Sequence, residues 1–153
     1  MISTHSISTN SLRYFPHFSG LNEEDLRRIA GITERVEFEA GEELLVEGSV
    51  ATHFCLLMSG EVQIVYRLGD NRTVAADVLV AGEAFGWSAL LEPHRLTATC
   101  VGNRKGEYLR IEAESLRRLC EQNPNSGYRL ALEISKLLRD RLSALRVQIA
   151  AAL

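Results

Sequence analysis

Apolar residues change their spacing along this chain of 153 residues, and the spacing predicts where helices and strands lie. In residues 21–30 they recur at three- and four-residue steps behind Asn22, a good helix N-cap, with acidic residues in the first turn. This pattern predicts a short amphipathic helix that ends near Gly31. From residue 33 the period falls to two, because Val36 and Phe38 alternate with charged residues as in a half-buried strand.

Short apolar segments separated by glycine turns then follow at regular spacing, which is typical of an all-β sandwich or barrel. Gly41, Gly48, Gly60 and Gly82 fall where strands are expected to break, since glycine adopts positive φ at little cost. The further strands predicted are residues 44–46, 54–58, 62–66, 74–80, 97–101 and 108–111.

Two helices are predicted after the last strand. Residues 114–122 place apolar side chains on one side, and Asn123-Pro124 ends this helix. A longer helix runs from about residue 126 to the C-terminus and carries an apolar seam with coiled-coil spacing. A lone helix would expose this stripe, so it needs a partner surface, which is either another molecule or the chain's own barrel. The seam consists of Tyr128, Leu132, Ser135, Leu138, Leu142, Leu145 and Ile149.

The composition fits one compact domain. Hydrophobic residues make up 46% of the chain, enough for a packed core at this length. Residues 1–12 are rich in Ser and Thr without periodicity, which predicts a flexible lead-in. The β domain is expected to span residues 13–125, and the closing helix residues 126–153.

Charge and segment composition limit the partners. The net charge is −3 and the pI about 5.8, with scattered Lys and Arg, so neither DNA binding by this chain alone nor a membrane surface is expected. No apolar run reaches the ~18 residues of a membrane span, and the N-terminus lacks the features of a signal peptide. Cys55, Cys100 and Cys120 form no CxxC pair, which favours reduced thiols and a cytoplasmic location.

The sequence gives little support for an enzyme or for a bound metal or cofactor. The four histidines are scattered without the paired spacing of a cupin-type metal site, and no nucleophile or phosphate-loop motif occurs. A haem or redox sensor using His53 and Cys100 is an alternative, but neither residue lies in a motif, and a structural role is favoured. We therefore expect a binding module without metal or cofactor rather than an enzyme.

The segment of residues 82–101 carries the binding chemistry. Gly82 and Gly86 bracket Phe85, and residues 87–91 suffice for a helical turn before Pro93. The free N–H groups at the start of such a turn attract anions. Ser88, Thr97 and Thr99 add hydroxyls and Arg95 a positive charge, which together suggest a small phosphate cradle.

Phe85-Gly86 and Thr97-Ala98-Thr99 resemble the phosphate cassette of the cyclic-nucleotide-binding domain, which catabolite-activator-type regulators share with the regulatory subunits of cyclic-nucleotide-dependent kinases. The turn glycines resemble that family's pattern too, and the resemblance extends from about residue 15 to about residue 146. It implies a double-stranded β-helix (jelly-roll) β-roll, mainly β with flanking helices: a short N-terminal helix and a long C-terminal dimerisation helix. The implied homodimer interface is Leu138, Leu142, Leu145 and Ile149.

Two cassette positions depart from the family. Trp87 stands where the family has the glutamate that holds the ribose 2′-hydroxyl, and Leu96 where it has the arginine that pairs with the cyclic phosphate. Arg95 lies one residue early and reaches the site only if its side chain turns inward. Cyclic AMP and cyclic GMP are therefore expected to bind weakly or not at all. A different small anionic or nucleotide-like effector would be lined by Phe85, Gly86, Trp87, Ser88, Ala89, Arg95, Leu96, Thr97, Ala98 and Thr99.

Three functions follow from this resemblance. The leading hypothesis is a dimeric sensor or regulatory domain that acts on another protein through its last helix. The second is the effector half of a transcription regulator, although the chain shows no helix-turn-helix after the dimer helix. The third is a structural dimer module with a degenerate pocket.

Overall fold

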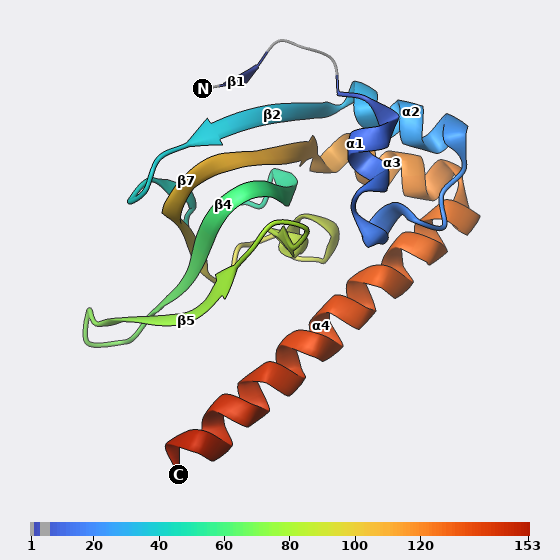
Figure 1. Cartoon of the computed structure of the whole chain (residues 1–153). Helices are drawn as coiled ribbons and strands as arrows, with labels where there is room; N and C mark the ends of the chain where they lie inside the picture. The colour runs from blue at the N-terminus through green and yellow to red at the C-terminus, as the bar shows by residue number, and fades with distance from the viewer. Residues whose placement is uncertain (1, 4–6) are drawn as a thin grey trace.

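An antiparallel sheet rolls up on itself in the computed structural model, which describes residues 2–3 and 7–153 (Figure 1). Hydrogen-bonded neighbours follow the order β1-β2-β7-β4-β5, with β3 paired to β7 and β6 to β4. This is the mainly β roll with flanking helices that the resemblance implied. The strands are β1 (Ile2–Ser3), β2 (Thr33–Phe38), β3 (Glu43–Leu45), β4 (His53–Arg67), β5 (Thr73–Leu79), β6 (Ala84–Phe85) and β7 (Thr99–Glu112).

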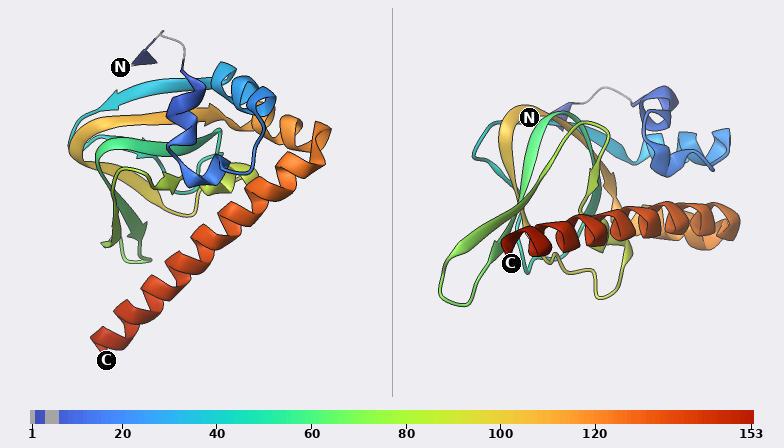
Figure 2. Two further views of the ribbon diagram at one scale, coloured as in Figure 1. Left: turned by 45° about the vertical axis from the view of Figure 1, so that its right-hand side comes forward. Right: turned by 60° about the horizontal axis from the view of Figure 1, so that its bottom comes forward.

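The helices gather at one end of this roll, and the longest one leaves from there (Figure 1). Both views of Figure 2 show α4 running from that end past the rolled strands. The three predicted helices are confirmed as α2, α3 and α4, with boundaries shifted by at most two residues. The helical elements are α1 (Thr9–Arg13), η1 (Pro16–Phe18), α2 (Glu23–Gly31), η2 (Trp87–Leu90), α3 (Ala113–Gln122) and α4 (Pro124–Ala152). Among the described residues, no helix combines the length and apolar character needed to cross a bilayer.

Two pairs of predicted strands are single long strands. Residues 54–58 and 62–66 both belong to β4, while residues 97–101 and 108–111 are largely joined in β7. The predicted break at Gly60 is instead a bulge, because the register between β4 and β7 shifts on either side of it. Gly60 has φ +81°, and a Cβ there would lie 2.5 Å from the carbonyl oxygen of Lys105. A bulge bends a strand without ending it.

The predicted flexible lead-in is wrong for residues 7–12. The Ser8 side chain accepts a hydrogen bond from the Ser11 amide (3.2 Å) and so caps α1, while Ile7 and Leu12 are buried. A run of Ser, Thr and Asn had the composition of a linker, yet it contains a helix cap. The part of that prediction concerning residues 1 and 4–6 lies outside the described residues.

The core has two parts that meet near the cassette. One joins the end of the roll to the helices, and the other fills the roll itself. Leu45 and Trp87 pack against both, so they connect the roll's interior with the helical end. The large buried side chains of the first part include Leu12, Phe15, Phe18, Leu26, Ile29, Phe54, Leu116, Leu130 and Ile134, and those of the second Phe38, Leu57, Val62, Leu79, Phe85 and Tyr108.

A buried carboxylate positions the start of α4. Asp25 of α2 is 2% exposed and accepts hydrogen bonds from the Asn123 side-chain amide (2.7 Å) and the Ser126 hydroxyl. Both donors lie at the junction of α3 and α4. From the sequence, Asp25 was expected only as one of the acidic residues in the first turn of a helix. In the structure its hydrogen-bond partners lie about a hundred residues away, so Asp25 holds α2 and the start of α4 together.

Asp25→Ala is predicted to lower the free energy of unfolding by about 3 kcal/mol, because it leaves buried donors on Asn123 and Ser126 without an acceptor. Urea unfolding followed by circular dichroism measures the loss. Glu24→Ala is the matched control: among the described residues, this neighbouring carboxylate is ion-paired with Arg28 alone and is 72% exposed, so its loss is expected to cost less than about 0.5 kcal/mol. Equal losses in the two variants would contradict the clamp.

Candidate functional site

A left-handed glycine turn joins β6 to η2 at the predicted cassette. Gly86 has φ +71°, and a Cβ there would lie 3.0 Å from both the His53 carbonyl oxygen and the Leu45 side chain. Only glycine therefore fits without displacing its neighbours. The helical turn predicted for residues 87–91 is the 3₁₀ turn η2, which stops at Leu90 because Leu91 has extended backbone.

The cavity inside this turn is nearly filled. Its volume is about 20 Å³, which is room for about one water molecule. Its lining contains no cationic side chain, and a sugar phosphate has no space in it. The lining residues are Leu45, Ile64, Phe85, Gly86, Trp87, Ser88, Leu96, Thr97, Ala98 and Cys100.

Seven of the ten predicted site residues line this cavity, and three do not. Arg95 is exposed and its guanidinium donates to the Gly48 carbonyl (3.2 Å), so it does not replace the missing cassette arginine. Arg95 pairs with Val50 in an extended bridge while its neighbour Leu96 is buried, as expected of adjacent residues that face opposite ways. The Thr99 hydroxyl accepts from the Glu47 amide (3.0 Å), and Ala89 is fully buried.

The two thiols near the cassette are buried and free. Cys55 and Cys100 are buried in the roll. Burial raises the pKa of Cys100 to about 12 and also raises that of Cys55, so both remain protonated at neutral pH. His53 lies at the start of β4, paired in register with Glu112, whereas Cys100 pairs with Ile64. The described His, Cys, Asp and Glu residues form no group of three that could hold a metal ion.

A second cavity, which the sequence did not predict, lies between the roll and α4. Its volume is about 210 Å³. Trp87 and Ile64 line both this cleft and the cassette cavity, so the two cavities adjoin at these residues. The cleft is lined by Ile64, Tyr66, Ala76, Asp77, Trp87, Leu138, Arg141, Leu142, Ala144, Leu145 and Gln148.

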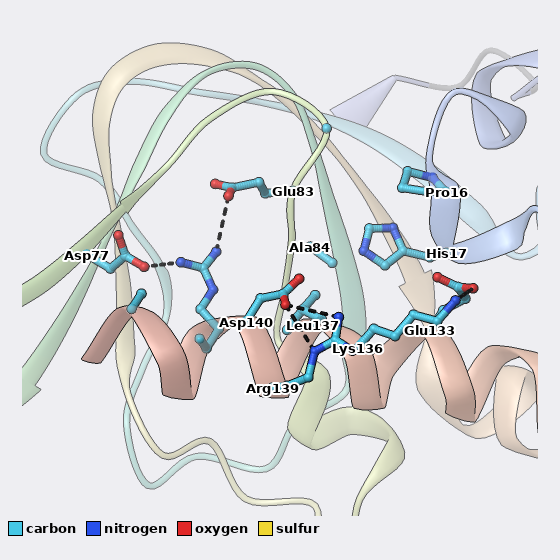
Figure 3. A pocket seen from close by; sticks show the side chains of 13 residues that line it. Pro16, His17, Asp77, Glu83, Ala84, Glu133, Lys136, Leu137, Arg139 and Asp140 are labelled. Carbon is cyan, nitrogen blue, oxygen red and sulfur yellow. Dashed lines mark hydrogen bonds and ion pairs between the residues drawn. The ribbon is translucent and has the colours of Figure 1, made fainter. Parts of the chain in front are cut away.

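Polar contacts hold α4 against β5 beside this cleft. The Arg141 side chain is only 19% exposed, donates to Asp77 and lies 3.6 Å from a carboxylate oxygen of Glu83. Figure 3 shows Asp77 and Glu83 facing α4 from the roll. Further along the helix, the Gln148 amide donates to the Ala76 carbonyl (3.2 Å). The apolar seam of α4 gave no indication of this role for Arg141, because its partners are about 60 residues away in the chain.

A buried histidine faces α4 from η1 (Figure 3). His17 packs against the rings of Phe15 and Phe54, and its Nδ1 atom is buried without a hydrogen-bond partner among the described residues. Burial lowers the pKa of His17 and outweighs the Glu133 carboxylate, which acts in the opposite direction. His17 is therefore neutral at pH 7, and α4 packs on an uncharged ring.

Sequence comparisons identify relatives of this chain. The family model of the cyclic nucleotide-binding domain matches residues 35–123. The chain is 30% identical over 115 residues to cGMP-dependent protein kinase, isozyme 1, of Drosophila melanogaster, covering 73% of this chain and 15% of the kinase. It is 27% identical over 127 residues to the cyclic AMP receptor protein of Thermus thermophilus, covering 82% of this chain and 58% of the receptor. The chain thus spans less than two thirds of either relative.

Solved structures share the fold. A protein from Geobacter metallireducens assigned as a cyclic nucleotide-binding protein has a TM-score of 0.80 and 30% identity, covering 89% of this chain and 98% of that one. A cyclic nucleotide-binding domain from Methylobacillus flagellatus has a TM-score of 0.84 at 15% identity, covering 99% and 89%. At that lower identity the likeness concerns the fold alone.

Cyclic AMP and cyclic GMP are predicted to bind this chain weakly or not at all. The cavity of about 20 Å³ must open to admit them, and Leu96 leaves the phosphate without a guanidinium, a loss of roughly 2–5 kcal/mol. Isothermal titration calorimetry is expected to show no saturation in the low micromolar range. Arg95→Ala is expected to leave the titration unchanged, because that side chain lies outside the cavity. Sub-micromolar affinity for either nucleotide would overturn the prediction.

His17 is predicted to make stability fall in mild acid. The pKa of His17 is lower in the folded state than its value near 6.5 in the unfolded chain. Below about pH 6.5 the unfolded chain therefore binds a proton that the folded state does not, and the free energy of unfolding falls as the pH falls. Urea midpoints measured between pH 7.5 and 5 are expected to fall less steeply for His17→Phe than for the unmodified chain. Parallel pH profiles would show that the buried imidazole contributes nothing.

Proposed function

Because the chain belongs to the cyclic nucleotide-binding domain family, we propose that it is a regulatory domain that senses a small effector at the mouth of the roll and signals to another protein through α4. The observation that carries this proposal is the position of Trp87, which lines both the cassette cavity and the cleft under α4. A molecule that displaces Trp87 would alter the surface on which the helix lies. A binding module fits these features better than an enzyme.

A chain of contacts supports signalling from the cassette to α4. The Ala89 carbonyl at the end of η2 accepts from the Arg117 guanidinium of α3 at 2.5 Å. The α3–α4 junction is in turn held by Asp25 through Asn123 and Ser126. Movement of η2 would therefore pull on α3 and shift the base of α4, and an effector biases that movement by its differential affinity for the two positions.

The exposed seam of α4 supports a homodimer. Leu142 is 51% and Ile149 62% exposed, and Leu145 is exposed as well, whereas Leu138 is half-buried against the core. The chain's own roll therefore covers only part of the stripe, and the remainder favours a second copy as partner. The free thiols of the chain support a reducing, cytoplasmic setting for this dimer.

Two alternatives keep specific support. The first is the effector half of a transcription regulator, with DNA bound by another segment or chain, which is supported by the shared fold of the N-terminal domain of a transcriptional regulator from Streptomyces coelicolor. The nearly filled cassette cavity favours a structural dimer module with a degenerate pocket. A thermal-shift screen against nucleotides and small anions tests the latter, because a ligand that binds the folded state raises the melting temperature by mass action.

Leu142→Glu is predicted to weaken dimerisation at least tenfold, because it buries a carboxylate in the apolar seam without a partner. Sedimentation velocity across a concentration series measures the dissociation constant. Ser143→Glu is the matched control, since Ser143 is exposed and lies off the seam, and it is expected to leave association unchanged.

Two results would contradict this interface. One is an unmodified chain that stays monomeric at 100 micromolar, and the other is an equal loss of association in the two glutamate variants.

A further inference from the structure

We propose that the cleft between α4 and the roll binds an uncharged aromatic or aliphatic molecule of about eight to ten non-hydrogen atoms, with the Trp87 indole as its wall. This inference rests on the proposed regulatory function and names the effector class. It replaces the anionic effector expected from the cassette pattern with a neutral one that lies against the signalling helix.

The size and surface of the cleft fit such a molecule. Its volume is about 210 Å³, and apolar cavities of about 150 Å³ in proteins bind benzene. Ile64 and Trp87 contribute apolar surface from the roll, and Leu138, Leu142 and Leu145 from α4. The cleft therefore accommodates one small ring system or a chain of about eight carbons, but not a nucleotide.

The charges at the cleft oppose an anion. Among the described residues, its charged lining groups are Asp77 and Arg141, which are paired with each other. Arg141 also lies 3.6 Å from the carboxylate of Glu83, so its positive charge is already met by two acids. A carboxylate or phosphate entering the cleft would lose its hydration without gaining a free cation. An uncharged molecule has no such cost.

Burial of exposed leucine side chains of α4 would favour binding of an apolar molecule in the cleft. Leu142 and Leu145 line the cleft and yet are 51% and 39% exposed. An apolar occupant would cover part of this surface, and removing apolar surface from water is favourable. The same two leucines belong to the proposed dimer seam, so occupancy of the cleft and association of the helices act on shared side chains.

Trp87 is the chain's one tryptophan, and its fluorescence therefore reports on the cleft directly. The full chain is titrated with 1-octanol and, as a matched anionic probe, with octanoate below its micelle concentration. A saturable change in Trp87 emission with 1-octanol is expected, with at least tenfold weaker binding of octanoate. Cyclic AMP and inorganic phosphate are titrated in the same way.

A variant that fills the cleft tests its location. Ala76→Leu adds a side chain to the lining from β5 and is expected to weaken 1-octanol binding at least tenfold. Ala75→Leu, the matched control on the same strand, is exposed and outside the lining, and it is expected to leave binding unchanged. Ala144→Leu fills the same cleft from α4, which keeps the test informative if Ala76→Leu does not fold.

The proposal is overturned if 1-octanol causes no saturable change, if octanoate binds as tightly, or if both filling variants bind 1-octanol normally. Saturable binding of cyclic AMP or phosphate without a response to 1-octanol would reject the neutral effector class while leaving the regulatory function in place. A chain that responds to none of the probes and is also monomeric would reject both.

Discussion

The left-handed turn at Gly86 is the constraint on which the site depends. The backbone there passes so close to the His53 carbonyl and the Leu45 side chain that only glycine fits. By reversing direction at this point, the chain places η2 beside α3 and Trp87 where the cassette cavity and the cleft under α4 adjoin. The contact from Arg117 to the Ala89 carbonyl then fixes the far end of η2 to α3. One backbone conformation thus sets both the position of Trp87 at the cleft and the contact between η2 and α3.

Side-chain alternation next to this turn decides what the site can bind. Leu96 is buried and lines the cavity, whereas Arg95 is exposed and bonded to Gly48. An arginine moved by one residue along an extended segment changes face, and its charge is lost to the interior. The cavity that remains is apolar and nearly filled, and Trp87 takes up the space next to it. The glycine turn that resembles the family's cassette is therefore present, whereas the cavity inside it offers no cationic side chain to a phosphate.

Local signals in the sequence predicted the parts of the fold that depend on neighbouring residues. The Asn22 cap and its apolar steps identified α2, and the glycine spacing identified a rolled sheet. Signals at long range were missed, since the partners of Asp25 and Arg141 lie far away in the chain. Gly60 was read as a strand end because a bulge and a turn both require positive φ, and only the register across the sheet separates them. The cassette resemblance located the turn correctly, but only three-dimensional structure tells which side chains enter the cavity.

The long helix is packed on the core through Leu130 and Ile134 in its first half, and its apolar side chains are only partly covered further along. Its base is fixed by the buried Asp25, and Arg141 and Gln148 attach its second half to β5. Between the base and Arg141, Leu138 is half-buried, while Leu142 beyond it is half exposed. A molecule that covers these two leucines would therefore change how strongly α4 packs against the roll. We expect that change in free energy to be comparable with the contribution of the polar contacts of Arg141 and Gln148. A surface that is neither fully buried nor fully solvated lets an occupant of the cleft and a partner helix influence each other, because each changes the apolar area left for the other.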